Sequence, residues 1–433
     1  MYYENNWQSL NSRPVPAWFG KAKFGIFIHW GLYSVPAYTA RGQYAEWYMQ
    51  QLRDEHHPAR AFHDRVYGKG FRYEDFVSRF TAELFDAAQW AELFRKSGAK
   101  YINFVSKHHD GFCLYKSKYA YNWNSVDVGP HRDFLAELRE AMEGTGVRFG
   151  VYHSVYEWFH PLYLENPETY ATEHLIPMLR ELMENYRPYT LFTDGEWEHP
   201  SATWHATEFL QWLFNESSVR DTIVVNDRWG KETRGRLGGN YTTEYGEVGG
   251  GVQIEDHTRP FEECRGIGKS FGLNRVEGVD DYMTAKELLT TLCDLVSKGG
   301  NFLLNIGPAA DGTIPVIMEE RLRQMGDWLA VNGEAIYDSE VYDREGEPGV
   351  WYTKRDGHLY AILDRFPFGR RVLDKVPYSD KRTARLLGNE EIPIPVREKN
   401  GRTELCFPPI DPSAVQTKEL YVIRLDLDKE TNT

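Results

Sequence analysis

The stretch Tyr189-Thr-Leu-Phe-Thr-Asp194-Gly-Glu196-Trp decides the fold of this chain, because it runs from apolar and β-branched residues directly into two spaced carboxylates. A second stretch, Tyr101-Ile-Asn-Phe-Val-Ser-Lys-His108-His109-Asp-Gly, ends in the same way on imidazole and charge. In a parallel α/β architecture the chemistry lies at the carboxyl ends of the strands. Both stretches are therefore expected to be strands that end at the floor of an active site.

Strand and helix patterns alternate around these two stretches, from about Lys23 to Asn332. Amphipathic helices are expected between the strands, for example from Asp86 to Ser97, where Gly98 follows. The strand candidates are Phe24–His29, Tyr101–Ser106, Arg148–His153, Thr190–Thr193, Thr222–Asn226, Phe261–Arg265 and Asn301–Ile306. This order predicts an α/β fold with a parallel sheet, and at this length it favours a (β/α)8-like barrel. Seven strands rather than eight are compatible with an incomplete barrel.

The pattern changes after Asn332-Gly333. The stretch from Val350 to Leu363 predicts two strands around an Asp-Gly turn, and further short strands follow up to Leu427. A small antiparallel β-sandwich is therefore expected at the C-terminal end. The predicted division is a catalytic barrel domain over residues 1–337 and a β-sandwich domain over residues 338–433.

The composition limits the partners. With 50 basic and 64 acidic residues the net charge is −14, and no basic stripe is present, which argues against nucleic acid. No apolar run reaches the length of a membrane helix, and no signal segment is visible, so a cytoplasmic location is expected. The four cysteines have no zinc spacing, and a disulfide framework is not expected. The oligomeric state stays open, and a homo-oligomer is compatible with the sequence.

Asp194 is the central candidate for catalysis. It could be a helix cap or a loop carboxylate, but Leu191 and Phe192 anchor the strand in the core and Gly195 permits close approach of a ligand. Glycosidases use one carboxylate to attack the anomeric carbon and a second group to protonate the leaving oxygen. A polyhydroxylated substrate is therefore expected.

Three histidines end predicted strands: His29, His108 and His109. Neighbouring residues of a strand point to opposite faces, so two imidazoles from one strand are poorly placed for one metal ion. Hydrogen bonding to sugar hydroxyls is the favoured interpretation, with a metal site and a structural role as alternatives. Glu46 and Trp47 offer a hydroxyl acceptor beside a stacking surface, or else the first turn of an ordinary helix.

Together these motifs resemble glycoside hydrolase family 29, the α-L-fucosidases, and most closely its animal lysosomal branch. The matching segments occur in one order along the chain: Phe24-Gly-Ile-Phe-Ile-His-Trp-Gly, Ala45-Glu-Trp-Tyr, Lys107-His-His-Asp-Gly-Phe, Trp123-Asn-Ser-Val-Asp, Phe192-Thr-Asp-Gly-Glu-Trp, Asn226-Asp-Arg-Trp-Gly and Gly299-Gly-Asn-Phe-Leu-Leu-Asn-Ile-Gly-Pro. The run that begins at Tyr152 points to the animal branch. The resemblance implies a retaining exo-α-L-fucosidase that acts on fucosylated glycans and needs no cofactor or metal.

The resemblance also implies roles for individual residues. Asp194 would be the nucleophile. Glu262, which matches a Trp-Glu segment of the family, is narrowly preferred over Glu244 as the acid/base, with Glu247, Asp256 and Glu263 as the next candidates. The residues implied to bind the substrate are His29, Glu46, Trp47, His108, His109, Tyr152 and Phe192.

Two departures from the family pattern stand out. Many members have Trp where this chain has Phe192, and some bacterial members carry an Arg in the loop that here reads Tyr241-Thr-Thr-Glu-Tyr-Gly-Glu247. Three alternative functions stay open at this point. They are hydrolysis of a related sugar such as an α-L-galactoside, binding of carbohydrate without catalysis, and a metal-dependent hydrolase.

Overall fold

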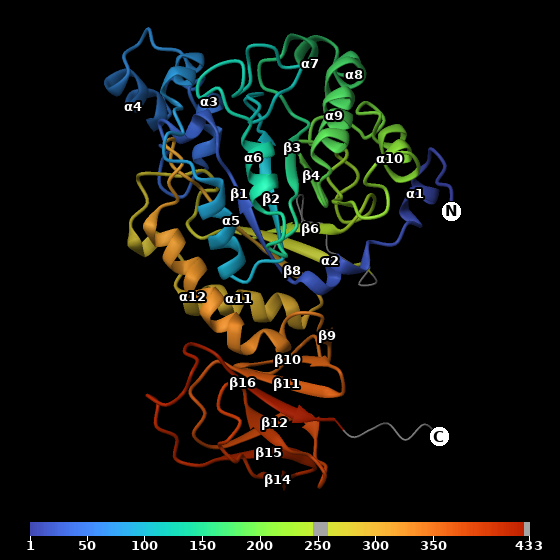
Figure 1. Ribbon diagram of the computed structural model, residues 1–433, viewed down its shortest axis with the longest axis vertical. Coiled ribbons are helices and arrows are strands. Elements are labelled where there is room, and N and C mark those ends of the chain that lie inside the picture. The colour runs from blue at the N-terminus through green and yellow to red at the C-terminus, as the bar shows by residue number, and fades with distance from the viewer. Residues whose placement is uncertain (246–258, 428–433) are drawn as a thin grey trace.

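The computed structural model describes residues 1–245 and 259–427. Eight parallel strands form one sheet in the order β5-β4-β3-β2-β1-β8-β7-β6, with its helices on the outside (Figure 1). The strands are β1 Phe24–Ile28, β2 Tyr101–Lys107, β3 Val151–Ser154, β4 Thr190–Asp194, β5 Val224–Val225, β6 Tyr241–Glu244, β7 Phe261–Gly266 and β8 Asn301–Ile306. The expected parallel α/β fold is confirmed.

The sheet curls until its two edges meet. Asn226, just after β5, pairs in parallel with Asn240, just before β6, and Asn240 N donates to Val225 O at 3.0 Å. Since β5 has only two residues, the seam between β5 and β6 is short. The sequence did not predict β6. Its four residues were expected to lie in a loop.

Helices cover the barrel on its outer side. They are α1 Trp7–Asn11, α2 Ala17–Ala22, α3 Tyr48–Gln51, α4 Pro58–Val66, α5 Ala87–Lys96, α6 Phe134–Ala141, α7 Pro161–Glu165, α8 Pro167–Tyr170, α9 Ile176–Tyr186, α10 Ala206–Asn215, α11 Ala285–Ser297 and α12 Val316–Asn332. The start of α5 follows from its sequence, because the Asp86 carboxylate accepts from Gln89 N at 3.0 Å and caps the free amides. In the described residues no helix is long and apolar enough to cross a membrane.

An apolar cluster fills the barrel interior. It comprises Phe19, Ala22, Phe27, Tyr101, Val105, Tyr152, Phe192, Val224, Cys264, Phe271 and Leu303. These side chains come from most of the strands and close the barrel from below. Polar groups at the carboxyl ends of the strands therefore lie above a buried apolar layer.

The C-terminal part contains two antiparallel sheets, ordered β13-β16-β11-β10-β9 and β12-β15-β14. Their strands are β9 Glu340–Val341, β10 Val350–Arg355, β11 His358–Leu363, β12 Gly369–Pro377, β13 Ala384–Leu386, β14 Val396–Lys399, β15 Arg402–Phe407 and β16 Tyr421–Asp426. Apolar residues of both sheets form a shared core, as the sequence predicted for a sandwich. It lies below α11 and α12 in Figure 1, where Trp328 Nε1 donates to Leu420 O at 2.9 Å.

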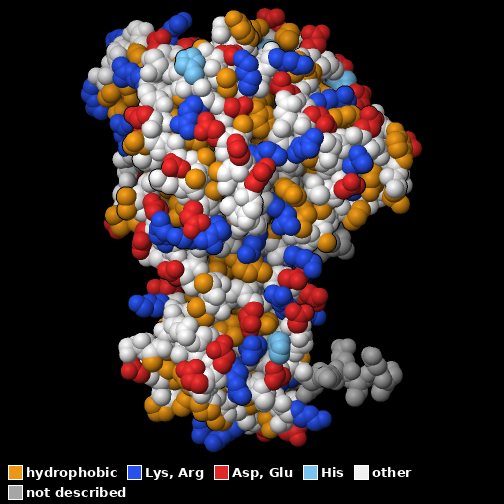
Figure 2. All heavy atoms as spheres, viewed as in Figure 1, with side chains coloured by type: hydrophobic (Ala, Val, Ile, Leu, Met, Phe, Trp, Pro, Cys, Tyr) orange, Lys and Arg blue, Asp and Glu red, His pale blue; other side chains and the backbone are white. Residues whose placement is uncertain are grey.

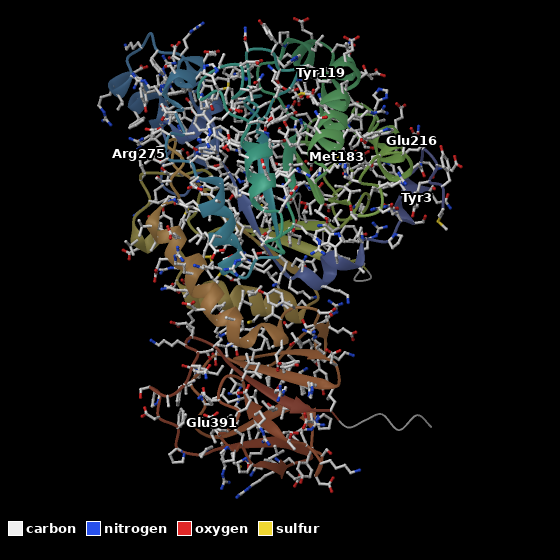
Figure 3. The ribbon with its side chains drawn as sticks, viewed as in Figure 1. Tyr3, Tyr119, Met183, Glu216, Arg275 and Glu391 are labelled. Carbon is white, nitrogen blue, oxygen red and sulfur yellow. The ribbon has the colours of Figure 1, made fainter. Side chains whose placement is uncertain are left out.

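The N-terminal segment is fastened to the side of the barrel. Figure 3 labels Tyr3 on the same side as Glu216, which follows α10. Tyr3 N donates to Asn215 Oδ1 at 2.9 Å, and its ring lies edge-on to Phe214. Acidic and basic side chains are interspersed over the face seen in Figure 2, as the composition led us to expect.

Candidate active site

Asp194 ends β4 at the carboxyl edge of the barrel, and four side chains surround its carboxylate. Oδ1 accepts from Arg228 Nη1 at 2.6 Å and from Arg234 Nη2 at 3.3 Å. Oδ2 accepts from the Tyr152 hydroxyl at 3.0 Å and lies 3.8 Å from His109 Nε2. Burial alone would raise the pKa of Asp194, but Arg228, His109 in its protonated form at acidic pH, and Arg234 outweigh it and hold the pKa well below its usual value. The carboxylate is therefore ionised at neutral pH.

Gly195 lets the chain turn away directly after Asp194. Its φ is +84°, and a Cβ there would lie 2.5 Å from the Tyr156 Cβ and 3.2 Å from His109 Cε1. A larger residue would clash and would strain the backbone. The glycine thus permits the close contact between the β4 end and the histidine segment.

Arg228 joins two carboxylates. It follows β5, and while Nη1 contacts Asp194, Nη2 lies 3.6 Å from Glu244 Oε2 at the end of β6. Nε donates to Thr242 Oγ1 at 3.0 Å, and the guanidinium carbon lies 4.9 Å from the centre of the Phe192 ring. One buried cation therefore holds Asp194 and Glu244 next to each other, although they are 50 residues apart in the sequence.

Glu244 is open to solvent, and Glu262 is not. Side-chain exposure is 28% for Glu244, whose Oε1 accepts from the Tyr44 hydroxyl at 2.8 Å. On β7, Glu262 pairs with Thr242 of β6, which comes two residues before Glu244. Its carboxylate accepts a hydrogen bond from the hydroxyl of Tyr101, the first residue of β2. Its pKa is raised to about 7 chiefly by burial.

The structure therefore separates Glu262 from Asp194. Cys264 comes two residues after Glu262 on β7, and Phe192 comes two residues before Asp194 on β4. Both side chains belong to the interior apolar cluster, which lies between the two carboxyl groups. Among the described residues no hydrogen bond or ion pair joins Glu262 to Asp194 or Arg228. Of the three further candidates, Glu263 pairs with Arg265, and Glu247 and Asp256 lie outside the described residues.

The histidines are neutral and face the same space. His29 Nδ1 lies 2.6 Å from Asn305 Oδ1, and Asn305 Nδ2 donates to Phe271 O at 2.7 Å. Asn305 Oδ1 must then accept, which places the proton on His29 Nδ1 and leaves Nε2 as an acceptor. Burial lowers the pKa of His29 to about 3.

The same logic applies to His109. Its Nδ1 lies 2.6 Å from Ser154 Oγ, which donates to Tyr156 O at 2.6 Å, so His109 Nε2 is also a free acceptor. Burial lowers the pKa of His109 to about 4. His108 is stacked on Tyr152 at 5.5 Å between ring centres, and its buried Nδ1 has no hydrogen-bond partner. Such ring nitrogens without partners are suited to bonding with sugar hydroxyls, which both donate and accept.

Glu46 and Trp47 complete one wall. Trp47 lies 5.5 Å from His109 and 5.9 Å from Trp197 between ring centres, the latter pair being stacked. Glu46 is buried, and its Oε2 accepts from Gly272 N at 2.8 Å and from Ser270 Oγ at 3.4 Å. Burial raises the pKa of Glu46 to about 8, so the carboxyl is protonated at neutral pH. Phe192, by contrast, lies beneath Asp194 as part of the floor.

The sequence reading missed Arg228 and Arg234. Arg228 was visible in the Asn226-Asp-Arg-Trp-Gly motif just after a strand, although no role was assigned to it there. Arg234 lies in a loop whose sequence carries no pattern. Both are cations largely shielded from solvent, with side chains 4% and 12% exposed, and such residues need ionised partners nearby.

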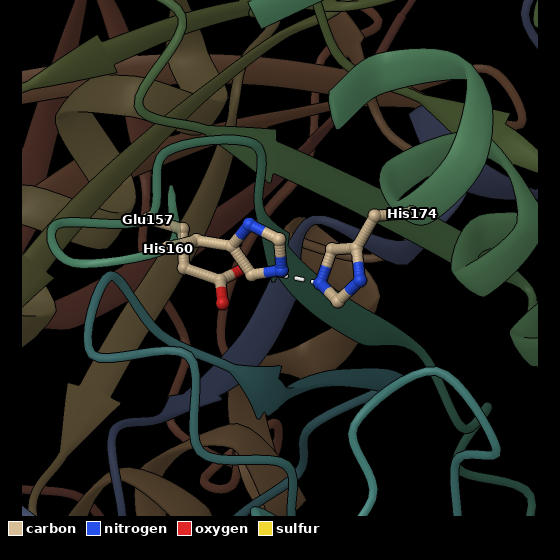
Figure 4. A group of neighbouring side chains, drawn as sticks. All are labelled: Glu157, His160 and His174. Atoms are coloured by element: carbon tan, nitrogen blue, oxygen red, sulfur yellow. Dashed lines mark ion pairs between the residues drawn. The ribbon is translucent and has the colours of Figure 1, made fainter. Parts of the chain in front are cut away.

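A group with metal-ligand residue types lies beside this site. Glu157, His160 and His174 offer ligand atoms within 4.8 Å of one another (Figure 4). However, Glu157 Oε2 already accepts from Lys107 Nζ at 2.7 Å and from the Tyr170 hydroxyl at 2.9 Å. The buried Lys107 ammonium needs this carboxylate as its counter-ion. The arrangement favours an ion pair that anchors the residue before His108.

A (β/α)8 barrel with an ionised carboxylate, a second carboxylate beside it and hydroxyl acceptors at its carboxyl edge defines the class of barrel glycoside hydrolases. A family model described as Alpha-L-fucosidase matches residues 1–334. The chain therefore belongs to the α-L-fucosidase family, as its motifs predicted.

Individual relatives agree with this assignment. The plasma α-L-fucosidase of Rattus norvegicus is 45% identical over 386 residues, which cover 86% of this chain and 82% of that protein. The solved structure of Thermotoga maritima α-fucosidase with a mechanism-based inhibitor has a TM-score of 0.85 at 35% identity, covering 98% of this chain and 100% of that one. The same enzyme with fucose gives a TM-score of 0.82 at 35% identity and the same coverage.

We expect Glu46→Gln to change how stability depends on pH. Because the folded protein binds the Glu46 proton more tightly than the unfolded chain does, its contribution to stability is present at low pH and is lost as the pH rises from 4.5 to about 8. Glutamine keeps the shape and does not titrate. Relative to the parent protein, the free energy of unfolding of the variant should rise by about 1 kcal/mol per pH unit over this range.

Urea unfolding at a series of pH values measures this effect. Glu55→Gln, at an exposed position, is the matched control and should follow the parent protein. Parallel curves for Glu46→Gln and Glu55→Gln would contradict the assignment of a proton to Glu46.

Proposed function

We propose that this protein is a retaining exo-α-L-fucosidase that removes terminal α-L-fucose from glycans through a covalent glycosyl-enzyme intermediate. The observation that carries this proposal is the Asp194 carboxylate, kept ionised by Arg228 beside neutral imidazoles at the carboxyl edge of the barrel. Family membership and the names of the relatives support α-L-fucose as the sugar that is removed. Residues 1–337 would form the catalytic unit, since every proposed site residue lies within them, and the location in the cell stays a prediction.

The contacts of Asp194 support its role as the nucleophile. A carboxylate must be ionised to attack, and Arg228 and Arg234 ensure this. Because both guanidinium groups bind Oδ1, Oδ2 is the oxygen free to attack the anomeric carbon, with the Tyr152 hydroxyl steadying it. As the bond from Oδ2 to this carbon forms, the bond to the glycosidic oxygen breaks, and its electron pair leaves with that oxygen.

Glu244 is proposed as the acid/base in place of the narrowly preferred Glu262. It shares Arg228 with Asp194, and its partial exposure gives it access to the leaving group. Glu244 donates a proton to the departing glycosidic oxygen. In the second step its carboxylate takes a proton from water, whose oxygen attacks the anomeric carbon and releases Asp194.

The side chains around Asp194 support recognition of hydroxyl groups. His29 and His109 present Nε2 as acceptors, and His108 adds an unpaired Nδ1. Protonated Glu46 can donate as well as accept. Trp47 supplies an apolar surface on which a deoxysugar methyl group or ring face can pack.

We expect Asp194→Gly to lose about three orders of magnitude or more in kcat on an aryl α-L-fucoside, since the attacking oxygen is removed. Azide could fill the space and attack from the same side, giving a fucosyl azide of inverted configuration. Chromatography and NMR of the product measure this. Asp356→Gly is the matched control, because Asp356 is exposed and already has a positive φ. High activity of Asp194→Gly without azide would disprove the assignment.

Glu244→Ala and Glu262→Ala form a matched pair for the acid. A general acid matters most when the leaving group is poor, so Glu244→Ala should lose about 100-fold more activity on fucosyl oligosaccharides than on activated aryl fucosides. Glu262→Ala should change the activity on both classes of substrate by the same factor, and it should lower the unfolding temperature. Steady-state kinetics over leaving groups of different pKa decide this. If instead Glu262→Ala shows the larger loss on oligosaccharides, Glu262 is the acid/base. If neither variant depends on the leaving group, the role moves to Glu247 or Asp256.

We also expect hydrolysis to need no added metal. Since Lys107 and Tyr170 already occupy the Glu157 carboxylate, prolonged dialysis against EDTA should leave kcat within about twofold of the untreated enzyme. Turnover before and after dialysis, with zinc and manganese added back, measures this. A large loss that only one of these ions restores would establish a metal-dependent enzyme. A faster reaction on α-L-galactosides than on α-L-fucosides in the same assays would instead identify the alternative sugar.

A further inference from the structure

The loop between β5 and β6 directs a second guanidinium into the site. Arg234 is 12% exposed and donates through Nη2 to Asp194 Oδ1 at 3.3 Å. Its Nε donates to Glu196 Oε1, and its Nη2 lies 3.4 Å from Glu196 Oε2. One side chain thus spans the carboxylate at the end of β4 and the carboxylate two residues further along.

Glu196 depends on this contact. Its side chain is 1% exposed, and within residues 1–245 and 259–427 Arg234 donates the hydrogen bonds that its carboxylate accepts. Burial raises the pKa of Glu196, and the charge of Asp194 raises it further, against the effect of Arg234. Without this arginine, two buried carboxylates would repel each other beside the reacting centre.

We propose that Arg234 is a positioning residue that neutralises Glu196 and thereby keeps Asp194 ionised and fixed through Oδ1. Five groups, alternately carboxyl and guanidinium, then form a chain, Glu196–Arg234–Asp194–Arg228–Glu244. The inference rests on the proposed function, in which Asp194 is the nucleophile, and it extends that function to a residue outside the proposed catalytic pair.

The geometry explains why lysine is a poor substitute for this arginine. The guanidinium presents separate N–H groups to two carboxylates, whereas an ammonium is a point charge that contacts one of them well. Arg228 binds the same Asp194 oxygen and acts on Glu196 through its charge, but in the described residues it makes no hydrogen bond or ion pair to Glu196, so it replaces Arg234 only in part. Loss of Arg234 therefore leaves Glu196 without a directly bonded cation.

The test compares Arg234→Met, Arg234→Lys and the double variant Glu196→Gln/Arg234→Met, with Arg236→Met as the matched control on an exposed residue of the same loop. The pH profile of kcat/KM on an aryl α-L-fucoside is measured. In Arg234→Met the acidic limb should move up by about one pH unit, with kcat reduced about tenfold or more and KM changed much less. Arg234→Lys should be intermediate.

The double variant shows whether Arg234 acts by compensating the charge of Glu196 or only by supporting the structure of the loop. Once Glu196 is neutral, the repulsion is gone, and at least half of the shift in the acidic limb should be recovered. Arg236→Met should match the parent enzyme. An acidic limb in Arg234→Met that coincides with that of Arg236→Met, or a double variant no better than Arg234→Met, would overturn the inference.

A second measurement keeps the inference testable if the proposed function fails. A parent enzyme without activity on fucosides would refute the function alone, and urea unfolding at neutral pH then decides the role of Arg234. Arg234→Met should unfold at a clearly lower urea concentration than Arg236→Met, and adding Glu196→Gln should restore part of the difference. Equal midpoints for Arg234→Met and Arg236→Met would refute the charge coupling.

Discussion

The pairing of Asp194 with Arg228 is the interaction on which the rest of the site depends. A carboxylate this deeply buried would take up a proton unless a cation compensated the loss of water. Arg228 in turn needs carboxylates, and it finds a second one in Glu244. Because Asp194, Arg228 and Glu196 are buried and each depends on a partner of opposite charge, loss of one partner weakens its neighbours in the chain.

The barrel makes this chain of charges possible. Its carboxyl edge collects the ends of β4, β5 and β6, and the interior cluster below them excludes water. In such surroundings hydrogen bonds and ion pairs are stronger than in solvent, and the same condition keeps His29 and His109 neutral. The apolar layer therefore strengthens the ion pairs of Asp194. It also keeps the imidazoles neutral, so that they can accept hydrogen bonds from hydroxyl groups.

Raised pKa values alone do not identify the catalytic residues here. Glu262 and Glu46 have pKa values of about 7 and 8, each because of burial, and either value would suit an acid at neutral pH. Glu262 is closed off at the amino ends of the strands by Tyr101, and Glu46 is held by the Gly272 loop. Position relative to Asp194, rather than ease of protonation, makes Glu244 the better candidate for the acid.

The sequence by itself determined the parallel α/β fold, the antiparallel C-terminal sheets, the family and the position of Asp194 at a strand end. These features rest on local periodicity and on contiguous motifs, which a single segment carries. Only the tertiary structure decided that β6 is the eighth strand, that Glu262 lies apart from Asp194, and that Arg228 and Arg234 face it. The physical reason is that ion pairs join residues far apart in the chain, and no local pattern records which strand ends the closing of a barrel brings together.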